Sequence, residues 1–230
     1  MPVPRPAADT RTRILDAAEL LLVEHGLEAT TLRMITAAAG VNLAAVNYHF
    51  GAKETLIEEV FRRRLAGLNA ERLQALDALE AAAGGAPVKP RLLLEAFFGV
   101  ALRLAADVDG GGRTFMRLLS RTYIEPAQFV RSFLAEEYAA VITRFKAALC
   151  KALPAVPREE ILWRFHFMIG ALSYALSGAD ALQIVSGMPL DDDPQALSAR
   201  LMSFLVGGLR SPLPDIPAKA AKRPRPRKAA

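Results

Sequence analysis

The sequence lacks the features that mark disulfide-rich, secreted and membrane proteins. Cys150 is the only cysteine among its 230 residues, which excludes an internal disulfide and a thiolate metal cluster and predicts a small core side chain there. No uncharged apolar run approaches the roughly 18–20 residues that cross a bilayer. The first nine residues also lack the apolar stretch of a signal peptide. We therefore expect a cytoplasmic protein without membrane contact.

Net positive charge is confined to one end of the chain. The net charge is +5, but from Arg210 onward seven basic residues stand against Asp215, so this end carries +6 and the rest about −1. Residues 211–230 are rich in Pro, Lys and Arg and are expected to be disordered, like residues 1–8. The tail either attracts phosphate without sequence preference or keeps this end soluble. Charge alone does not identify a nucleic-acid-binding protein.

Strand-like alternation is nearly absent, and apolar residues recur at helical spacing. A first helix is expected to end at Gly26, as at a left-handed C-terminal cap. An Ala/Gly/Pro-rich linker follows the fourth helix. The pattern predicts an all-α protein with a three-helix unit at 9–51 and a larger helical domain at 52–210. Further helices are expected from Thr30–Thr31 to Gly40 and at about 42–49, 52–79, 91–107, 113–124, 127–152, 158–186 and 195–209.

Two short helices joined by a glycine-containing turn match a helix-turn-helix. At 100° per residue the third helix turns Val46, Phe50 and Leu43 to one side, facing inward, and Ala44, Asn47 and Tyr48 outward. An alanine can touch a thymine methyl group, and an asparagine can pair with an adenine edge. A tyrosine hydroxyl can bind a phosphate. This face predicts a DNA-binding surface.

Asn42, Leu43, Tyr48 and His49 each allow more than one interpretation. Asn42 is either the cap of the third helix or a DNA contact, and Leu43 can face the core or the groove. His49 packs inside or binds a phosphate. Lys53, at the start of the fourth helix, adds charge beside free N–H groups. Tyr48 itself could instead be a half-buried surface aromatic.

Several motifs together resemble the TetR family of bacterial regulators. They are Ile14–Ala18, Thr30–Thr31, Ala39–Val41, Val46, Tyr48–Phe50 and Lys53–Leu56, which cover roughly Arg11 to Phe61. The resemblance implies that Thr31 caps the second helix and touches phosphate. It also implies that Asn42 to Tyr48 form the recognition helix, with His49 and Lys53 at the DNA backbone. Asn47 departs from the family pattern, because many relatives have a larger aromatic residue or leucine there.

The remaining helices are rich enough in apolar residues to enclose a pocket for a small hydrophobic effector. The candidate aromatic contacts are Phe97, Phe98, Phe115 and Phe165. Arg117, with Arg121 one turn further on, either pairs with an acidic group of a ligand or bonds to a nearby glutamate or backbone carbonyl. His166 is either a satisfied buried or interface histidine or a ligand contact.

The segment 161–178 is apolar nearly all round, which predicts packing on both its own domain and a second subunit. The last helix, with Leu197, Leu201, Phe204 and Leu205, supplies the other half of that contact. A twofold homodimer would place two recognition helices about one DNA turn apart on a palindromic operator.

Residues 41–51, 115–119 and 163–168 resemble PsrA-type members of the TetR family. This resemblance implies a repressor of fatty-acid metabolism genes that responds to long-chain fatty acids or their acyl-CoA forms. Asp191–Asp193 precede Pro194 and are expected to begin a helix rather than bind metal.

Two other functions remain open. One is a TetR-like regulator of efflux that senses planar aromatic drugs. The other is a helical lipid-binding protein or enzyme without DNA function. The sequence has no nucleophile–base pair, glycine-rich phosphate loop or metal-ligand spacing, so we expect neither catalysis nor a cofactor.

Overall fold

The computed structural model describes residues 9–124, 128–177, 185–187 and 193–215, and every regular element within these ranges is a helix. The all-α prediction is therefore confirmed. Residues 1–8 and most of the basic tail lie outside the described residues. The elements are α1 (Thr10–Ala29), α2 (Leu32–Ala39), α3 (Leu43–Phe50), α4 (Lys53–Ala82), α5 (Pro90–Leu94), the π-helical η1 (Glu95–Gly99), α6 (Val100–Ala106), α7 (Gly112–Ile124), α8 (Gln128–Ala152), α9 (Arg158–Leu176) and α11 (Pro194–Arg210).

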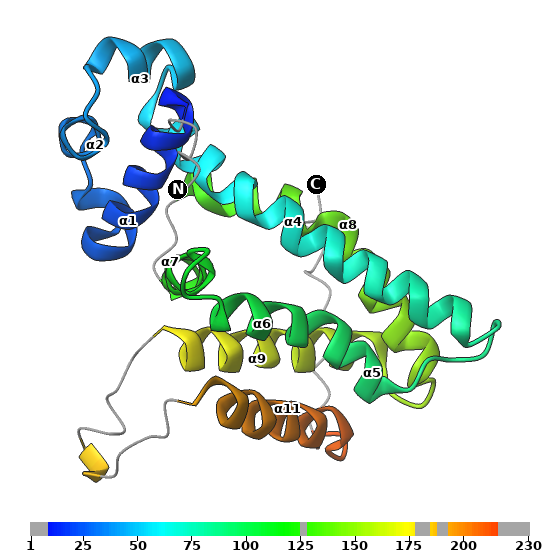
Figure 1. The fold of residues 1–230 in the computed structure, drawn as a ribbon. Coiled ribbons are helices and arrows are strands. Elements are labelled where there is room, and N and C mark those ends of the chain that lie inside the picture. The colour runs from blue at the N-terminus through cyan, green and yellow to red at the C-terminus, as the bar shows by residue number, and fades with distance from the viewer. Residues whose placement is uncertain (1–8, 125–127, 178–184, 188–192, 216–230) are drawn as a thin grey trace, which may run out of the picture.

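Helices α1, α2 and α3 form a small unit at one end of the molecule, as Figure 1 shows. Their inward side chains, among them Ile14, Leu22, Ile35 and Val46, are completely buried and form the core of this unit. The core continues into α4 through Leu56 and further apolar residues of its first turns. Because this unit shares its core with α4, its orientation depends on the helix that leads into the rest of the chain.

The predicted end of the first helix at Gly26 is only partly correct. Gly26 has non-helical backbone angles (φ 83°, ψ 176°) that interrupt α1, but helical turns resume and α1 ends at Ala29. A positive φ at this position favours glycine, which has no Cβ. The buried Thr30 hydroxyl then donates to the carbonyls of Leu21 (3.1 Å) and Gly26 (2.7 Å), which fixes the kink.

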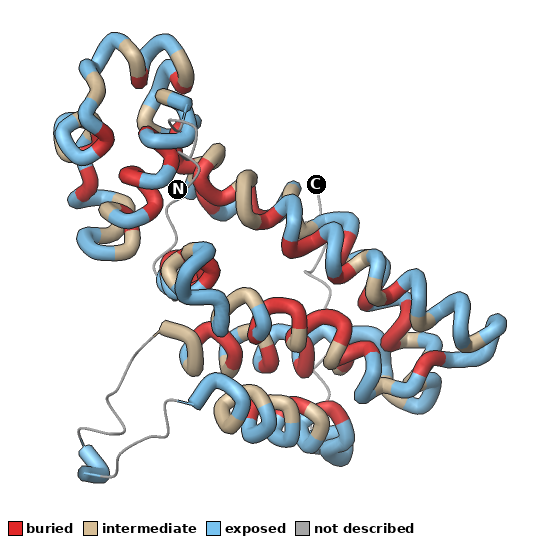
Figure 2. The backbone as a smooth tube through the Cα atoms, viewed as in Figure 1, coloured by how far each residue is buried: buried red, intermediate tan, exposed pale blue. Residues whose placement is uncertain are grey.

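The remaining helices form the larger part of the molecule, called the body from here on (α4 to α11). Helix α4 runs diagonally away from α1–α3 with α8 along it, and α6, α9 and α11 lie below (Figure 1). Buried positions line the sides of these helices that face one another, whereas their outer turns are exposed (Figure 2). The buried Arg164 of α9 donates to the Leu209 carbonyl (2.7 Å), which ties α11 to the body.

Two helices differ from their predicted form. The helix expected at 91–107 contains the π-helical segment η1, where the carbonyl of Phe97 accepts a hydrogen bond from Arg72 Nε (3.0 Å). Such π-segments widen one turn of a helix and are frequent at functional sites. Helix α9 ends at Leu176, short of the predicted 186, where the Ser177 N–H and hydroxyl both bond to the Tyr174 carbonyl.

Of the three aspartates at 191–193 that were expected to begin a helix, only Asp193 is described. Asp193 caps α11 by accepting bonds from the N–H groups of Gln195 (3.2 Å) and Ala196 (3.0 Å). Asp191 and Asp192 lie outside the described residues. Of the helices in the described ranges, none combines the length and apolar character needed to span a bilayer.

Candidate functional site

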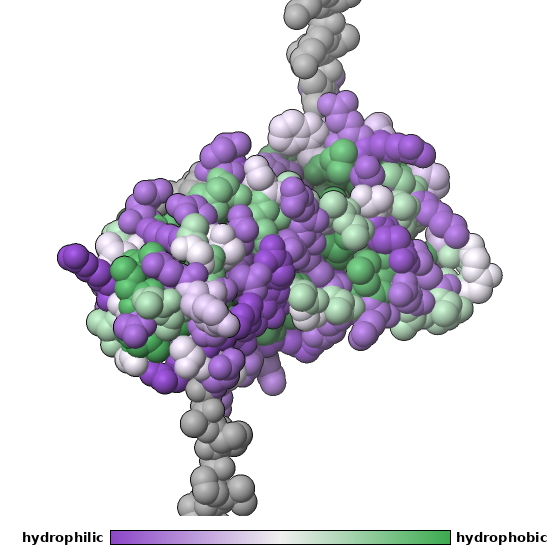
Figure 3. Space-filling view, turned by 90° about the horizontal axis from the view of Figure 1, so that it is seen from above, coloured by the Kyte–Doolittle hydropathy of each residue, from purple (hydrophilic) through white to green (hydrophobic). Residues whose placement is uncertain are grey.

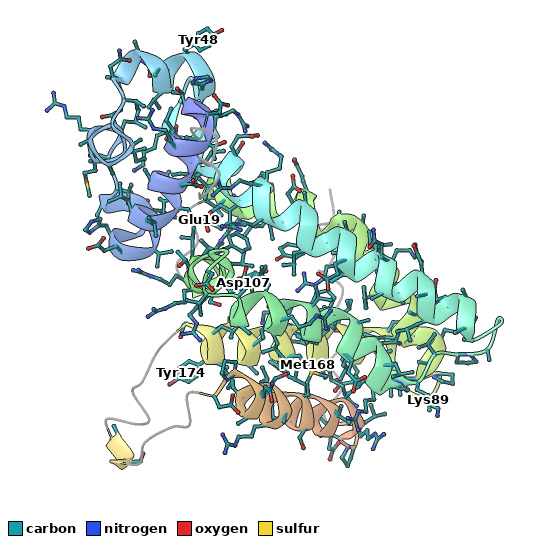
Figure 4. All side chains as sticks on the ribbon, viewed as in Figure 1. Glu19, Tyr48, Lys89, Asp107, Met168 and Tyr174 are labelled. Atoms are coloured by element: carbon teal, nitrogen blue, oxygen red, sulfur yellow. The ribbon has the colours of Figure 1, made fainter. Side chains whose placement is uncertain are left out.

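One face of α3 is free of the core and points away from the body. Tyr48 is 86% exposed, and Figure 4 shows it projecting from the outer end of α3. Ala44 and Asn47 are exposed beside it, whereas Val46 and Phe50 are buried, as the helical phase predicts. Leu43, whose direction was open, is exposed and belongs to the outward face. His49 is half-buried between the two faces.

Side-chain caps fix where α2 and α3 begin. The Thr31 hydroxyl accepts a bond from the Met34 N–H (3.3 Å), and Asn42 Oδ1 accepts one from the Ala45 N–H (2.9 Å). Each satisfies an N–H group that has no partner within its own helix. Both residues remain exposed, so capping and a phosphate contact are compatible at these positions.

The turn between α2 and α3 is held by residues outside it. Gly40 caps α2 in the left-handed conformation (φ 62°), which favours glycine. Arg13 of α1 donates to the carbonyls of Ala39 (2.5 Å) and Gly40 (2.8 Å).

Lys53 Nζ donates to the Leu27 carbonyl (2.8 Å), so it joins the start of α4 to the end of α1. Lys53 is thus already bonded before any phosphate arrives.

The body contains a cavity of about 410 Å³ between α4, η1, α7, α8 and α9. This volume lies within the range of small-molecule sites. Most of the lining is apolar, and two arginines supply its charge. The described lining residues are Arg72, Phe97, Met116, Leu119, Ser120, Thr122, Tyr123, Arg131, Leu134, Ala135, Tyr138, Ile142, Ile169, Leu172 and Ser173.

Arg72 of α4 is buried in the cavity wall with only 2% of its surface accessible. Its Nε donates to the Phe97 carbonyl and its Nη1 to Asn69 Oδ1 (3.2 Å). Asn69 in turn donates to the Glu137 carbonyl of α8 (3.0 Å). The guanidinium carbon lies 4.0 Å from the Phe97 ring centre, within cation–π range. No carboxylate among the described residues pairs with this charge.

A pair of tyrosines adds neutral hydrogen-bonding groups beside Arg72. Tyr123 lines the cavity and has 40% of its surface accessible. Burial and the neighbouring Tyr138 raise the pKa of Tyr123 well above its usual value. The Tyr123 hydroxyl therefore stays protonated near neutral pH and can donate a hydrogen bond.

Of the predicted effector contacts, the cavity lining includes only Phe97. Phe165 packs behind it with a ring-centre distance of 4.7 Å, and Phe98 and Phe115 are completely buried in the core. Helical spacing predicted their burial but not which buried rings border an empty space.

The three predicted polar contacts also lie away from the cavity. Arg117 is on the exposed side of α7, and Arg121 donates to the Val23 carbonyl of α1 (2.6 Å). That bond agrees with the backbone alternative considered for these arginines. His166 is exposed between Trp163 and Phe167, at ring distances of 5.9 Å from each.

Sequence reasoning missed the buried polar pair Asn69 and Arg72. Both lie on the apolar stripe of α4 with Leu65, Leu68 and Leu76, at spacings of three, four and seven residues. A charged residue on such a stripe is rarely buried without a special partner. This interruption was the available signal.

Helix α7 lies between the cavity and α1. Leu119, Ser120 and Tyr123 line the cavity, whereas Leu118 and Arg121 border a smaller hollow of about 190 Å³ against the end of α1. Thr122 lines both spaces. A ligand that displaces α7 would therefore also move the side of α7 that packs against α1.

A charged network joins α1 to α4 at the same junction. Glu19 of α1 is 3% exposed and pairs with Arg63 and, at 3.3 Å, Arg64 of α4. Figure 4 shows Glu19 between these helices. Burial opposes the charge on Arg63, but its bonds to Asp16 and Glu19 outweigh that cost and raise its pKa. This network fixes the angle at which α1–α3 sit on the body.

The outer faces of α9 and α11 carry large exposed apolar side chains. On α9 these include Trp163, Phe167 (64% exposed) and Tyr174, and on α11 Phe204 is 67% exposed. Figure 4 shows Tyr174 pointing outward. On the side away from α11, apolar side chains form separate patches among hydrophilic ones (Figure 3). Leu201 and Leu205, predicted for the dimer contact, are instead buried in the body.

Two family models match separate stretches of the chain. The model described as "Bacterial regulatory proteins, tetR family" matches residues 14–60, most of α1–α3 and the start of α4. The model described as "Tetracyclin repressor-like, C-terminal domain" matches residues 95–208, from η1 to α11. The two matches together cover both parts of the fold.

Individual proteins resemble the chain either in local sequence or in overall fold. The HTH-type transcriptional repressor KstR2 of Rhodococcus jostii is 43% identical over 65 residues, which are 26% of this chain and 32% of that protein. The chain thus matches about a third of this relative's length.

The fold as a whole resembles two solved regulator structures. The ketosteroid transcriptional regulator KstR2 of Mycobacterium tuberculosis has a TM-score of 0.60 at 18% identity, covering 90% of this chain and 98% of that chain. The fatty acid degradation regulator FadR of Bacillus halodurans has a TM-score of 0.59 at 17% identity, covering 90% and 99%. At these identities the likeness shows the fold.

Proposed function

Because the chain belongs to the TetR family, whose N-terminal and C-terminal models both match it, we propose that it is a homodimeric DNA-binding repressor that a small apolar effector releases from its operator. The exposed face of α3 carries this proposal. Asn47 presents hydrogen-bonding groups to a groove and Tyr48 presents its hydroxyl to a phosphate, while small or apolar neighbours allow close approach. Thr31, Asn42, His49 and Lys53 would contact the DNA backbone around it.

The dimer would form through the exposed apolar face of α9 and α11. Large apolar side chains gathered on an exposed face are typical of protein–protein contacts. Trp163, Phe167 and Phe204 would be covered by the same residues of a second copy. A twofold axis there would place two α3 helices on one side of a palindromic operator.

The effector is proposed to occupy the cavity, whose apolar lining supports the long-chain fatty acid or acyl-CoA that the PsrA-type resemblance implies. The alternative, a regulator that senses aromatic drugs, has less support. The described lining has no acid to pair with a cationic drug. A lipid-handling enzyme also has less support, since none of these residues is a histidine or cysteine.

Release would run through α7 as well as α4. Helix α4 contributes only Arg72 to the described lining, whereas α7 contributes Leu119, Ser120 and Tyr123 among others. An effector against α7 would move Arg121 and so the end of α1. The two α3 helices would then no longer match successive major grooves.

Selection of binding sites from a random duplex pool tests the DNA half of the proposal. We expect enrichment of a palindrome whose half-sites are centred about 10 base pairs, or a multiple of a turn, apart. Binding to this palindrome is then titrated with palmitate and palmitoyl-CoA, and release by either supports the effector assignment. Failure to enrich any palindrome at moderate salt would contradict the DNA-binding function.

A further inference from the structure

We propose that the effector cavity selects an apolar monocarboxylate, whose carboxylate binds the buried guanidinium of Arg72. This inference rests on the proposed function, because it specifies the chemistry of the same cavity. It replaces one of the two alternatives that the sequence left open for Arg117, pairing with an acidic ligand, since Arg117 lies on the exposed side of α7.

The donors of Arg72 are only partly used. Nε and Nη1 have acceptors at 3.0 and 3.2 Å, but Nη2 has none among the described residues. A buried charge without a counter-ion is costly unless a ligand or other group compensates it. Because Arg72 is 2% exposed and lines the cavity, a bound anion is the group that its free donors can reach.

The guanidinium is also held in place before a ligand arrives. The Phe97 carbonyl in η1 and the Asn69 side chain fix two of its edges, and the Phe97 ring lies against its face. Asn69 is itself bonded to the α8 backbone. A planar fork fixed in this way suits a carboxylate, which accepts paired hydrogen bonds from arginine.

The rest of the cavity favours one negative charge on an apolar body. Tyr123 can donate a further hydrogen bond beside Arg72, and Arg131 is exposed at the lining and forms no ion pair with any described residue. The other walls are mainly apolar, including Leu119, Leu134 and Leu172. The described lining holds no aspartate or glutamate to repel an anion.

The volume is large enough for such a ligand. A cavity of about 410 Å³ lies within the range of small-molecule sites. Decanoate, with its ten carbons and two oxygens, fits this space. The nucleotide part of an acyl-CoA would have to lie outside the cavity, and its thioester has no carboxylate for Arg72.

Calorimetric titration of the full-length dimer with matched ten-carbon probes tests the proposal. We expect decanoate to bind at least about 10-fold more tightly than decan-1-ol, because a hydrogen bond to a charged group contributes that much. Decylamine is expected to bind more weakly than either. Equal binding of decanoate and decanol would overturn the proposal without any variant being needed, as would a preference for decanoyl-CoA over decanoate.

Three arginine variants assign the preference to a residue. Arg72→Met should reduce the decanoate-to-decanol ratio to about 2 or less, and Arg72→Lys should restore part of it. A purely structural role of Arg72 would weaken both probes equally and leave the ratio unchanged, which would overturn the assignment. Arg117→Met is the matched control on the exposed side of α7 and should leave the ratio at its original value.

The outcomes distinguish a failure of the carboxylate site from a failure of the proposed regulatory function. If decanoate binds through Arg72 but leaves operator affinity unchanged, the carboxylate site stands and the release mechanism fails. If the protein binds no DNA, the regulatory function fails while the ligand ratio is still measured. A ratio near one in a protein that binds its operator tightly would contradict the carboxylate site alone.

Discussion

The α3 face and the body cavity differ in how the chain encodes them. The outward residues of α3 lie within six consecutive positions, from Leu43 to Tyr48, on a single two-turn helix. The cavity draws its described lining from five elements between residues 72 and 173. A surface formed by one helix follows from local periodicity, whereas a cavity depends on how distant helices pack. The comparison teaches that local sequence predicts a face formed by one helix, whereas it does not predict the lining of a cavity formed by several.

The largest predicted effect is a loss of operator affinity caused by a substitution in the body, far from α3. Phe167→Glu places a charge in the proposed dimer face, far from α3, and should lower operator affinity by about 100-fold or more, because two linked contacts become one. Sedimentation should show monomers at the same time. Glu159→Gln, an exposed change on the first turn of α9, serves as the control. A stable dimer with full operator affinity would refute the assigned face.

The junction between the two regions can be weakened by a single buried carboxylate. Glu19→Gln should lower the free energy of unfolding by about 2 kcal/mol, because Arg63 and Arg64 lose their buried partner while remaining partly hydrated. Urea unfolding followed by circular dichroism measures the change.

Asp16→Asn is the control for that junction, since Asp16 is exposed and also bonds to Arg63. We expect a change below about 0.5 kcal/mol. Equal effects of the two substitutions would mean that burial does not set the strength of this network.

Replacing the amide of Asn42 by a carboxylate separates its two proposed functions, helix capping and DNA contact. Asn42→Asp retains the cap on the Ala45 N–H, so stability should change by less than about 0.5 kcal/mol. The added negative charge would face phosphate and should weaken operator binding by about 10-fold. Asn42→Ala should instead cost about 1 kcal/mol of stability. Unchanged DNA affinity in the aspartate variant would show that Asn42 is only a cap.

The smallest expected effect concerns the most exposed aromatic residue of α3. Tyr48→Phe removes one hydroxyl and should weaken operator binding by about 3- to 10-fold, the value of one hydrogen bond to a charged phosphate. Stability should not change, since Tyr48 is 86% exposed. Filter binding at two salt concentrations gives the affinity. A larger loss for an unrelated DNA than for the selected palindrome would argue against a specific position for Tyr48.

These two regions also mark how far the sequence could be interpreted. The helix boundaries near Thr31, Gly40 and Asn42 could be predicted because caps and glycine conformations act within a few residues. The inward positions of Val46 and Phe50 followed from helical phase. The break at Gly26 was predicted as the end of the first helix, but the extra turn to Ala29 was not, because Thr30 stabilises it through its own hydrogen bonds.

The effector contacts could not be predicted in the same way. Phe98, Phe115 and Phe97 are all buried, yet only Phe97 borders the cavity, and periodicity does not distinguish a ring in a packed core from a ring beside a void. Arg117 and Arg72 show the same limit for charge. Arg117 stood out among apolar neighbours but points outward, whereas Arg72 is buried because α4 and η1 meet around it.

The most direct test of the account is reciprocal linkage between the two regions. Decanoate affinity is measured by calorimetry for the free dimer and for the dimer saturated with its selected palindrome. Binding free energies must couple equally in both directions, so we expect decanoate to bind the DNA complex more weakly by the same factor by which it weakens DNA binding, about 5- to 150-fold. Equal decanoate affinities with and without DNA would contradict the claim that the cavity controls α3.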